Sequence, residues 1–225
     1  MEFVLDTADF EAVRELNETL TIAGVTTNPT IITRSGHDPY EVAEEMAKIL
    51  TPSQKLFMQT IATDTEGMIA DAHAIKGLQR EDGPEMCVKI PVTPAGYRAI
   101  KAVAAEGTTV LATAIYSADE GFMAALNGAQ YLAPYVNRMD NYGDGVAQVL
   151  DLLEMLANAG LPTKVCAASF KNVRQVHDLI CAGIQAVTVA PDVVRNMIGH
   201  AGTDVAVKEF SANWHAAFGR DTFAK

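Results

Sequence analysis

The sequence predicts a single eight-stranded β/α barrel, and two observations lead to that prediction. Short apolar runs typical of strands alternate with amphipathic segments from one end of the chain to the other. Strict alternation requires a parallel sheet, and eight such units in 225 residues fit a closed barrel better than an open, doubly wound sheet. The expected strands are residues 2–6, 22–27, 55–60, 86–92, 108–113, 130–136, 164–169 and 185–190. The expected helices lie near residues 9–18, 39–50, 64–79, 95–105, 118–127, 145–158, 171–181 and 191–198.

Residue types at the segment ends support several of these helices. Thr63 with Glu66 and Ser117 with Glu120 have capping-box spacing, and Thr93 precedes a proline in the way an N-cap does. No GxGxxG sequence follows the first strand, which disfavours a dinucleotide-binding fold. Glycines mark the opposite junctions, where each helix must stop before the next strand: Gly107, Gly128, Gly160 and Gly183.

The last part of the chain is expected to lie outside the barrel. We assign residues 1–202 to the catalytic barrel and residues 203–225 to a C-terminal helix and tail. Phe210, Trp214 and Phe218 share one face of this helix, which is more apolar surface than a finished barrel needs. We therefore expect the helix to pack on a neighbouring subunit.

Charge and cysteine content narrow the partners and the compartment. Asp and Glu number 28 against 17 Lys and Arg, and a net charge of −11 argues against nucleic acid or an anionic membrane as a partner. The three cysteines Cys87, Cys166 and Cys181 are widely spaced in apolar surroundings, which favours reduced, buried thiols. The chain start lacks a signal-peptide pattern and no apolar run is long enough to span a bilayer, so we expect a cytoplasmic protein.

Polar side chains stand where the expected strands end, which is where β/α barrels carry their active sites. Seven of the eight strands deliver such a residue, so the active site is expected at this end of the barrel. The candidates are Asp6, Thr27, Asn28, Gln59, Lys89, Thr113, Tyr135, Arg138, Ser169 and Lys171.

Lys89 is the candidate nucleophile because it lies within an apolar run, MCVKIPV. Burying an ammonium is unfavourable unless the amine releases its proton, and a neutral amine attacks carbonyl groups. The resulting iminium ion is an electron sink for breaking or forming the neighbouring carbon–carbon bond. The alternative is a lysine whose long stem reaches past the strand end to water.

The other strand-end residues also admit two readings each. Tyr135, Thr113 and Gln59 are suited to holding a water or moving a proton, or else to ordinary hydrogen bonding within the barrel mouth. Asp6 either lines the lysine environment or caps the first helix. Asn28 either hydrogen-bonds a substrate hydroxyl or shapes the turn before a proline.

A phosphate site is expected from two cations and a hydroxyl beside the start of the 171–181 helix. Arg138, Ser169 and Lys171 supply these groups, and the free amides of a helix start favour an anion. The alternative is that both cations are simply solvated. The five histidines show no HExxH spacing, so no metal site is expected, and Ser169 lacks the GxSxG context of a hydrolase.

Six segments, in this order over the whole chain, resemble the small bacterial fructose-6-phosphate aldolases of the transaldolase superfamily: LDTAD, GVTTNPTII, VKIPVTPAG, TAIYSA, APYVNR and AASFK. The resemblance implies a class I aldolase with Lys89 as the Schiff-base lysine and Tyr135 as the acid/base residue. It also implies that Gln59 and Thr113 hold a catalytic water with Tyr135, and that Asp6 lines the same site.

The same resemblance assigns the substrate contacts. Asn28, with Thr27 beside it, is expected to contact substrate hydroxyls, while Arg138, Ser169 and Lys171 are expected to bind the phosphate of the aldehyde. The implied substrate is therefore a small sugar phosphate, and no cofactor is needed because the covalent lysine imine serves as the electron sink. Members of this subfamily form pentamers that pair into decamers, so a homo-oligomer is expected.

Four pocket positions separate these aldolases from the similar transaldolases, which usually carry Glu, Asn, Ser and Phe there. This chain has Gln59, Leu111, Ala133 and Tyr135, which is the aldolase pattern. The sequence therefore favours reversible cleavage of D-fructose 6-phosphate into dihydroxyacetone and D-glyceraldehyde 3-phosphate. A transaldolase that transfers the dihydroxyacetone unit between sugar phosphates is the nearest alternative, and a phosphosugar isomerase or a noncatalytic phosphate-binding barrel is the alternative of another class.

Overall fold

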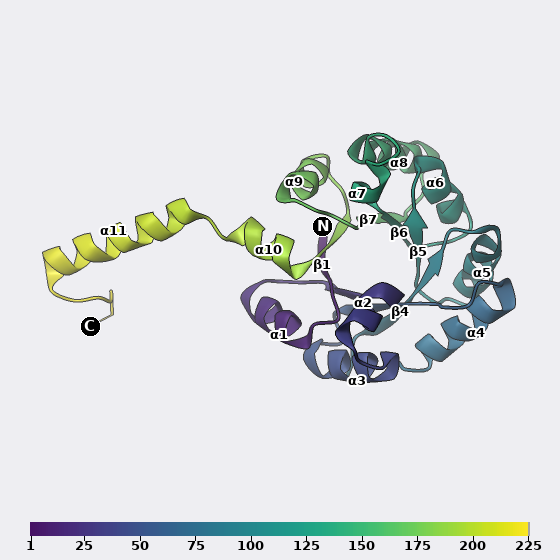
Figure 1. Cartoon of the computed structure of the whole chain (residues 1–225), viewed down its shortest axis with the longest axis horizontal. Helices are drawn as coiled ribbons and strands as arrows, with labels where there is room; N and C mark the ends of the chain where they lie inside the picture. The colour runs from purple at the N-terminus through teal and green to yellow at the C-terminus, as the bar shows by residue number, and fades with distance from the viewer. Residues whose placement is uncertain (225) are drawn as a thin grey trace.

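The computed structural model describes residues 1–224, which form a closed parallel barrel followed by a projecting helix (Figure 1). Each strand pairs in parallel with the next in chain order, and the eighth strand closes the barrel on the first. The predicted eight-stranded β/α barrel is confirmed. The strands are β1 (Glu2–Asp6), β2 (Gly24–Thr26), β3 (Lys55–Gln59), β4 (Glu85–Pro91), β5 (Val110–Ile115), β6 (Tyr131–Pro134), β7 (Lys164–Ala167) and β8 (Ala186–Val189).

The helices surround the barrel as an outer ring (Figure 1). Two short helices, Pro29–Ser35 and Val136–Met139, were not expected from the sequence, because seven and four residues are too few for a helical periodicity to emerge. The helices are α1 (Phe10–Thr19), α2 (Pro29–Ser35), α3 (Pro39–Ile49), α4 (Thr65–Lys76), α5 (Pro94–Ala105), α6 (Ala118–Leu126), α7 (Val136–Met139), α8 (Gly145–Ala159), α9 (Val173–Cys181), α10 (Pro191–Ile198) and α11 (Ala201–Phe218).

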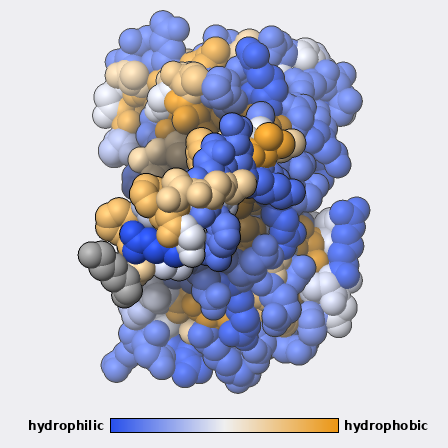
Figure 2. All heavy atoms as spheres, turned by 90° about the vertical axis from the view of Figure 1, so that its left-hand side faces the viewer, coloured by the Kyte–Doolittle hydropathy of each residue, from blue (hydrophilic) through white to orange (hydrophobic). Residues whose placement is uncertain are grey.

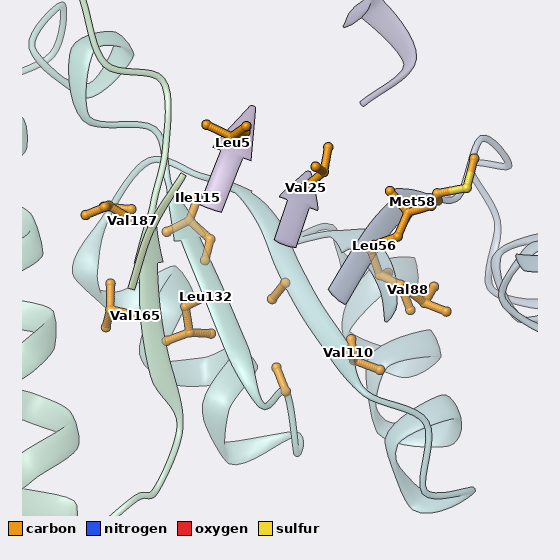
Figure 3. Packing of buried hydrophobic residues seen from close by; sticks show 14 of the residues in the cluster. Leu5, Val25, Leu56, Met58, Val88, Val110, Ile115, Leu132, Val165 and Val187 are labelled. Atoms are coloured by element: carbon orange, nitrogen blue, oxygen red, sulfur yellow. The ribbon is translucent and has the colours of Figure 1, made fainter. Parts of the chain in front are cut away.

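Alternate residues of each strand face the helices and form the main hydrophobic core. Figure 3 shows such side chains projecting from the strands, among them Leu56, Val88, Val110 and Leu132, all fully buried. The residues between them point into the barrel, where a second, separate cluster includes Phe57 and Leu111. This alternation decides which strand-end side chains can reach the barrel mouth.

The amino-terminal end of the barrel is closed by a charged and aromatic network. The Glu2 carboxylate accepts a hydrogen bond from Lys164 Nζ at 2.5 Å and another from Tyr131 Oη at 2.8 Å. Burial alone would raise the pKa of Glu2, but the hydrogen bonds from Lys164 and Tyr131 outweigh it and leave that pKa lowered. These contacts lie at the end of the barrel opposite to the one where the strands terminate.

The helix starts confirm two of the predicted caps and correct a third. Thr93 and Ser117 cap α5 and α6, accepting hydrogen bonds from main-chain N–H groups three residues later. The expected cap at Thr63 is wrong, because the Asp64 carboxylate accepts from the N–H of Gly67 at 2.9 Å instead. A carboxylate directly before the helix competes successfully with the hydroxyl one residue earlier.

The three cysteines do not share one environment. Cys87 and Cys166 are buried inside the barrel, as expected, whereas Cys181 is exposed at the end of α9. The expectation that all three are buried is therefore wrong at Cys181, which lies on the solvent face of its helix. Its sulfur lies 3.5 Å from Nε2 of His177, one helical turn earlier.

Helix α11 extends away from the barrel (Figure 1) and begins at Ala201, two residues before the expected boundary. None of its residues is buried, and Phe210 and Phe218 are 67% and 60% exposed. Figure 2 views the molecule from the side on which this helix projects, where apolar residues gather at the front. Lys225, the end of the expected tail, lies outside the described residues. No helix within residues 1–224 is both long and apolar enough to cross a membrane.

Candidate active site

The candidate site lies at the carboxyl end of the barrel, where five expected residues come from neighbouring strands. In the strand register Gln59 of β3 pairs with Lys89 of β4, and Lys89 pairs with Leu111 of β5. Each pairing places the residues on strands about 4.8 Å apart. Gln59, Lys89 and Leu111 therefore lie side by side on the inward face of the sheet, and Thr113 follows two residues after Leu111 on β5.

Lys89 is enclosed by the barrel and does not extend past the strand end. The residue is only 2% exposed, so the alternative of a side chain reaching into water is wrong. Its Nζ makes no hydrogen bond or ion pair with any residue that the structure describes. The amine is therefore enclosed by the barrel but unpaired within the described residues, and it remains free to react with a molecule in the mouth.

Asp6 belongs to a buried chain of hydroxyl groups. Its Oδ1 accepts a hydrogen bond from Thr26 Oγ1 at 2.8 Å, and Thr26 Oγ1 lies 2.6 Å from Thr188 Oγ1. Burial raises the pKa of Asp6, while the positive charges of Lys89 and Arg138 and the Thr26 hydrogen bond act in the opposite direction. Asp6 therefore lies within the electrostatic reach of the lysine.

The other reading of Asp6, as the cap of the first helix, is wrong. Asp9 caps α1 instead, because its Oδ1 accepts a hydrogen bond from the N–H of Ala12 at 3.1 Å. Asp6 is the last residue of β1 and lies on the inward face of the barrel, two positions after Val4. Its carboxylate is consequently part of the site and not of the helix start.

Thr113 and Tyr135 meet at the ends of β5 and β6. Their hydroxyl oxygens are 3.1 Å apart, and either can donate. The Gln59 Oε1 atom is buried and has no hydrogen-bond partner among residues 1–224, so it is free to accept a hydrogen bond from a bound molecule. The structure therefore brings Thr113 and Tyr135 into contact, while Gln59 comes from the end of β3, two strands before β5.

The expected phosphate residues lie on adjacent segments after β6 and β7. Main-chain hydrogen bonds join the two segments, since the N–H of Asn137 donates to the carbonyl oxygen of Ser169 at 3.0 Å. Arg138 lies over the Tyr135 ring at 5.0 Å from its centroid. Lys171 is exposed, and its main-chain N–H donates to Gln175 Oε1 at 2.9 Å. Arg138 and Ser169 are thus brought together more closely than their sequence separation indicates.

The β2 end places its polar residues differently from what the sequence led us to expect. Thr27 Oγ1 donates to the main-chain oxygen of Phe57 at 3.2 Å, whereas its neighbour Thr26 faces Asp6 in the interior. Asn28 caps α2 through a hydrogen bond from the N–H of Ile31 at 3.0 Å. Its side-chain Nδ2 makes no hydrogen bond within residues 1–224 and remains a possible donor to a ligand.

Sequence reasoning missed Thr26 and Thr188, because only the strand register shows that their side chains face inward. Counting alternate residues back from Asp6 and Gln59 along the paired strands places both threonines inward. It also missed Cys166, whose burial raises its pKa to about 12 while the nearby charge of Lys89 acts to lower it. Leu111 and Ala133, which were expected to shape the pocket, are fully buried in the interior cluster around these residues.

Comparison with known proteins agrees with this geometry. The family model described as transaldolase/fructose-6-phosphate aldolase matches residues 3–224. The chain belongs to this family. Within the transaldolase/fructose-6-phosphate aldolase family, a protein of Streptococcus pneumoniae described as a "probable fructose-6-phosphate aldolase" is 40% identical over 216 residues, which are 95% of this chain and 96% of that protein.

Among solved structures, the chain is also similar in fold to a protein of low sequence identity. The 4-hydroxy-tetrahydrodipicolinate synthase of Methylacidiphilum fumariolicum matches with a TM-score of 0.60 at 14% identity, over 84% of this chain and 67% of that one. At this level of identity the match concerns the fold alone. It places the chain among β/α barrels independently of any sequence motif.

Proposed function

We propose that this protein is a class I aldolase that reversibly cleaves D-fructose 6-phosphate into dihydroxyacetone and D-glyceraldehyde 3-phosphate. The observation that carries the proposal is the enclosed Lys89, whose Nζ is unpaired within the described chain. Its strand, β4, pairs with β5, which carries Thr113 of the hydroxyl pair formed by Thr113 and Tyr135. Membership of the transaldolase/fructose-6-phosphate aldolase family and the 40% identical relative support the same reaction.

The chemistry begins with attack of the Lys89 amine on the C2 carbonyl of the sugar phosphate, followed by loss of water to give an iminium ion. Removal of the C4 hydroxyl proton then lets the C3–C4 bond break, and its electron pair moves into the imine as an enamine. D-Glyceraldehyde 3-phosphate leaves first. Protonation of the enamine at C3 and hydrolysis release dihydroxyacetone and regenerate the amine.

The proton steps are assigned to Tyr135 together with a water. Tyr135 Oη can exchange a proton with Thr113 Oγ1 at 3.1 Å, and Gln59 offers a free acceptor in the same mouth. Because Gln59 is an amide and not a carboxylate, it orients a water without taking its proton. Protonation of the enamine by Tyr135 favours release of free dihydroxyacetone over transfer to a second sugar.

The substrate contacts follow from the residues around the mouth. The guanidinium of Arg138 and the hydroxyl of Ser169 are proposed to bind the phosphate with Lys171 at the rim. Asn28 is proposed to hydrogen-bond a substrate hydroxyl through Nδ2, with Thr27 supporting the strand end. A net charge of −11 on the whole chain makes such a local cation necessary for an anionic substrate.

The test is borohydride reduction of the protein in the presence of dihydroxyacetone, with intact mass and peptide mapping. We expect a reduced three-carbon adduct on Lys89, and none in the Lys89→Met variant. Lys171→Met is the matched control, since this lysine is exposed and is not expected to form an imine. An adduct elsewhere, or none, would overturn the proposal in favour of an isomerase or a binding barrel.

A second assay separates cleavage from transfer. We expect free D-glyceraldehyde 3-phosphate to form from D-fructose 6-phosphate alone, and at least as fast as transfer to erythrose 4-phosphate. Transfer that clearly outpaced cleavage would identify a transaldolase despite Gln59 and Tyr135. Both outcomes keep Lys89 as the imine lysine, so this assay addresses only the fate of the three-carbon unit.

We also propose that the protein is a cytoplasmic homo-oligomer in which α11 packs on a second copy. The support is the exposed apolar surface of Phe210, Phe218 and Val205 on a helix that none of the barrel covers. Sedimentation of the full chain is expected to give an assembly, with Phe210→Asp shifting it toward smaller species. A monomeric parent would overturn this proposal and leave the aldolase reaction untouched.

A further inference from the structure

An irregularity in β5 brings an additional aromatic residue to the mouth. Between Ala112 and Ile115 the β5–β6 register advances three residues on β5 but only two on β6, so one residue of β5 bulges out. That residue is Ala114, which has a left-handed backbone with φ of 57°. Because the bulge resets the alternation of side chains, both Thr113 and Tyr116 face the mouth.

At the barrel mouth Tyr116 contacts both Arg138 and Tyr135. Its Oη accepts a hydrogen bond from Nη1 of Arg138 at 3.4 Å, and its ring lies 5.9 Å from that of Tyr135. Arg138 in turn lies over the Tyr135 ring. The three side chains therefore touch one another in every pairing, which holds the guanidinium in one place.

Two further contacts hold Tyr116 in place. Its main-chain N–H donates to Glu120 Oε2 at 2.7 Å, and the Tyr142 ring packs edge-on against the Tyr116 ring at 6.0 Å between centroids. The Tyr116 hydrogen bond is also the first cause of the raised pKa of Arg138. An arginine with one donor engaged and its plane resting on a ring loses less side-chain entropy when its other donors bind an anion.

We propose that Tyr116 is a positioning residue for phosphate recognition: its hydroxyl and ring hold Arg138 so that the remaining guanidinium donors are preorganised for a phosphorylated aldehyde. The inference rests on the proposed function, because it takes Arg138 as the phosphate ligand of the aldehyde partner. Tyr116 makes no hydrogen bond with Lys89 within the described chain, and its hydroxyl is engaged by Arg138. It therefore acts on substrate affinity and not on carbon–carbon bond formation.

The test compares two aldehydes in condensation with dihydroxyacetone, D-glyceraldehyde 3-phosphate and unphosphorylated D-glyceraldehyde. Tyr116→Phe keeps both ring contacts and removes only the oxygen that accepts from Arg138. We expect its KM for the phosphorylated aldehyde to rise about three- to tenfold. Its kcat is expected to stay within about twofold, with the KM for D-glyceraldehyde unchanged.

Tyr142→Phe is the matched control, because that hydroxyl makes no hydrogen bond in the described chain and the residue is 82% exposed. It should leave both KM values unchanged. Equal effects of Tyr116→Phe on both aldehydes, a fall in kcat alone, or no effect would each overturn the positioning role. A general folding defect would lower the yield of borohydride-trapped Lys89 adduct, which we expect to equal that of the parent.

Binding of inorganic phosphate to the full chain provides a readout that does not depend on turnover. Isothermal titration is expected to give a Kd that is raised by a similar factor in Tyr116→Phe and is unchanged in Tyr142→Phe. If the parent formed no Lys89 adduct, the proposed aldolase reaction would fail while this titration still decided the role of Tyr116. Equal phosphate affinity in the parent and Tyr116→Phe would overturn the inference.

Discussion

Thr113 Oγ1 and Tyr135 Oη lie 3.1 Å apart across the ends of β5 and β6. The threonine is completely buried and its position is set by the strand, so it restricts the phenol to one orientation. The same phenol ring carries the guanidinium of Arg138 on its face. Tyr135 therefore joins the proton-transfer part of the site to the proposed phosphate part.

Replacing Tyr135 by Phe is expected to lower kcat for cleavage about 100- to 10,000-fold, because the ring remains while the proton donor is lost. Imine formation needs only the Lys89 amine, so borohydride trapping with dihydroxyacetone is expected to persist. Steady-state kinetics and intact-mass analysis check the two parts separately. Tyr40→Phe, at an exposed position on α3, is the control, and near-parental turnover in Tyr135→Phe would remove Tyr135 from the proton steps.

The pH dependence of stability should report the environment of Asp6. Burial raises its pKa in the folded state above the ordinary value of 3.8, so folding favours the protonated carboxyl group. Its contribution to stability is full below the ordinary value and is lost as the pH rises through the raised value. Asp6→Asn removes this titration, so its free energy of unfolding relative to the parent should increase with pH.

Denaturant unfolding of both proteins, from about pH 4 to about pH 8, measures this difference. The exposed Asp119→Asn on α6 serves as the control and should show no comparable trend. A difference between Asp6→Asn and the parent that stayed flat would mean that the charges of Lys89 and Arg138 balance burial at Asp6. A difference that fell with pH would mean that they outweigh it, and either result would contradict a raised pKa.

The sequence predicted the barrel well because strand and helix periodicities differ and each unit repeats them. β1 was predicted with its observed bounds, since a short apolar run ends at Asp6 and an amphipathic segment follows. Lys89 was identified because a single charge interrupts an apolar run. In these cases the deciding interactions are local in the chain, and the sequence therefore contains them.

Other features depend on contacts between distant segments. Thr26 was passed over for Thr27, because only pairing of β2 with β1 and β3 shows which threonine faces Asp6. The bulge at Ala114 has no residue signature, since alanine is not typical of a left-handed backbone. The contact of Tyr116 with Arg138 spans 22 residues and follows from that bulge.

Close packing between α5 and β4 leads to a stability prediction. A Cβ atom at Gly96 would lie 1.8 Å from the carbonyl oxygen of Pro91, which is main chain and cannot rotate away. Gly96→Ala is therefore expected to lower the free energy of unfolding by about 3 kcal/mol and to displace the end of the strand that carries Lys89. Gly143→Ala is the matched control, because nothing lies within 4 Å of its added Cβ. Chemical denaturation of both variants checks the difference, and equal stabilities would show that the helix can shift at little energetic cost.

The bulge at Ala114 gives the last prediction. A left-handed backbone costs a residue with a Cβ atom about 1 to 2 kcal/mol, and glycine escapes that cost while gaining freedom in the unfolded chain. Ala114→Gly is therefore expected to raise the free energy of unfolding by about 0.5 kcal/mol, measured by urea denaturation. Ala112→Gly, in the regular part of β5, should instead be destabilising by about 1 kcal/mol, since it loses a buried methyl group and strand rigidity.

Ala114→Val should destabilise the protein and should raise the KM for the phosphorylated aldehyde, because a β-branched residue resists the backbone that directs Tyr116 to Arg138. If valine were tolerated with both stability and KM unchanged, the bulge would not be what places Tyr116.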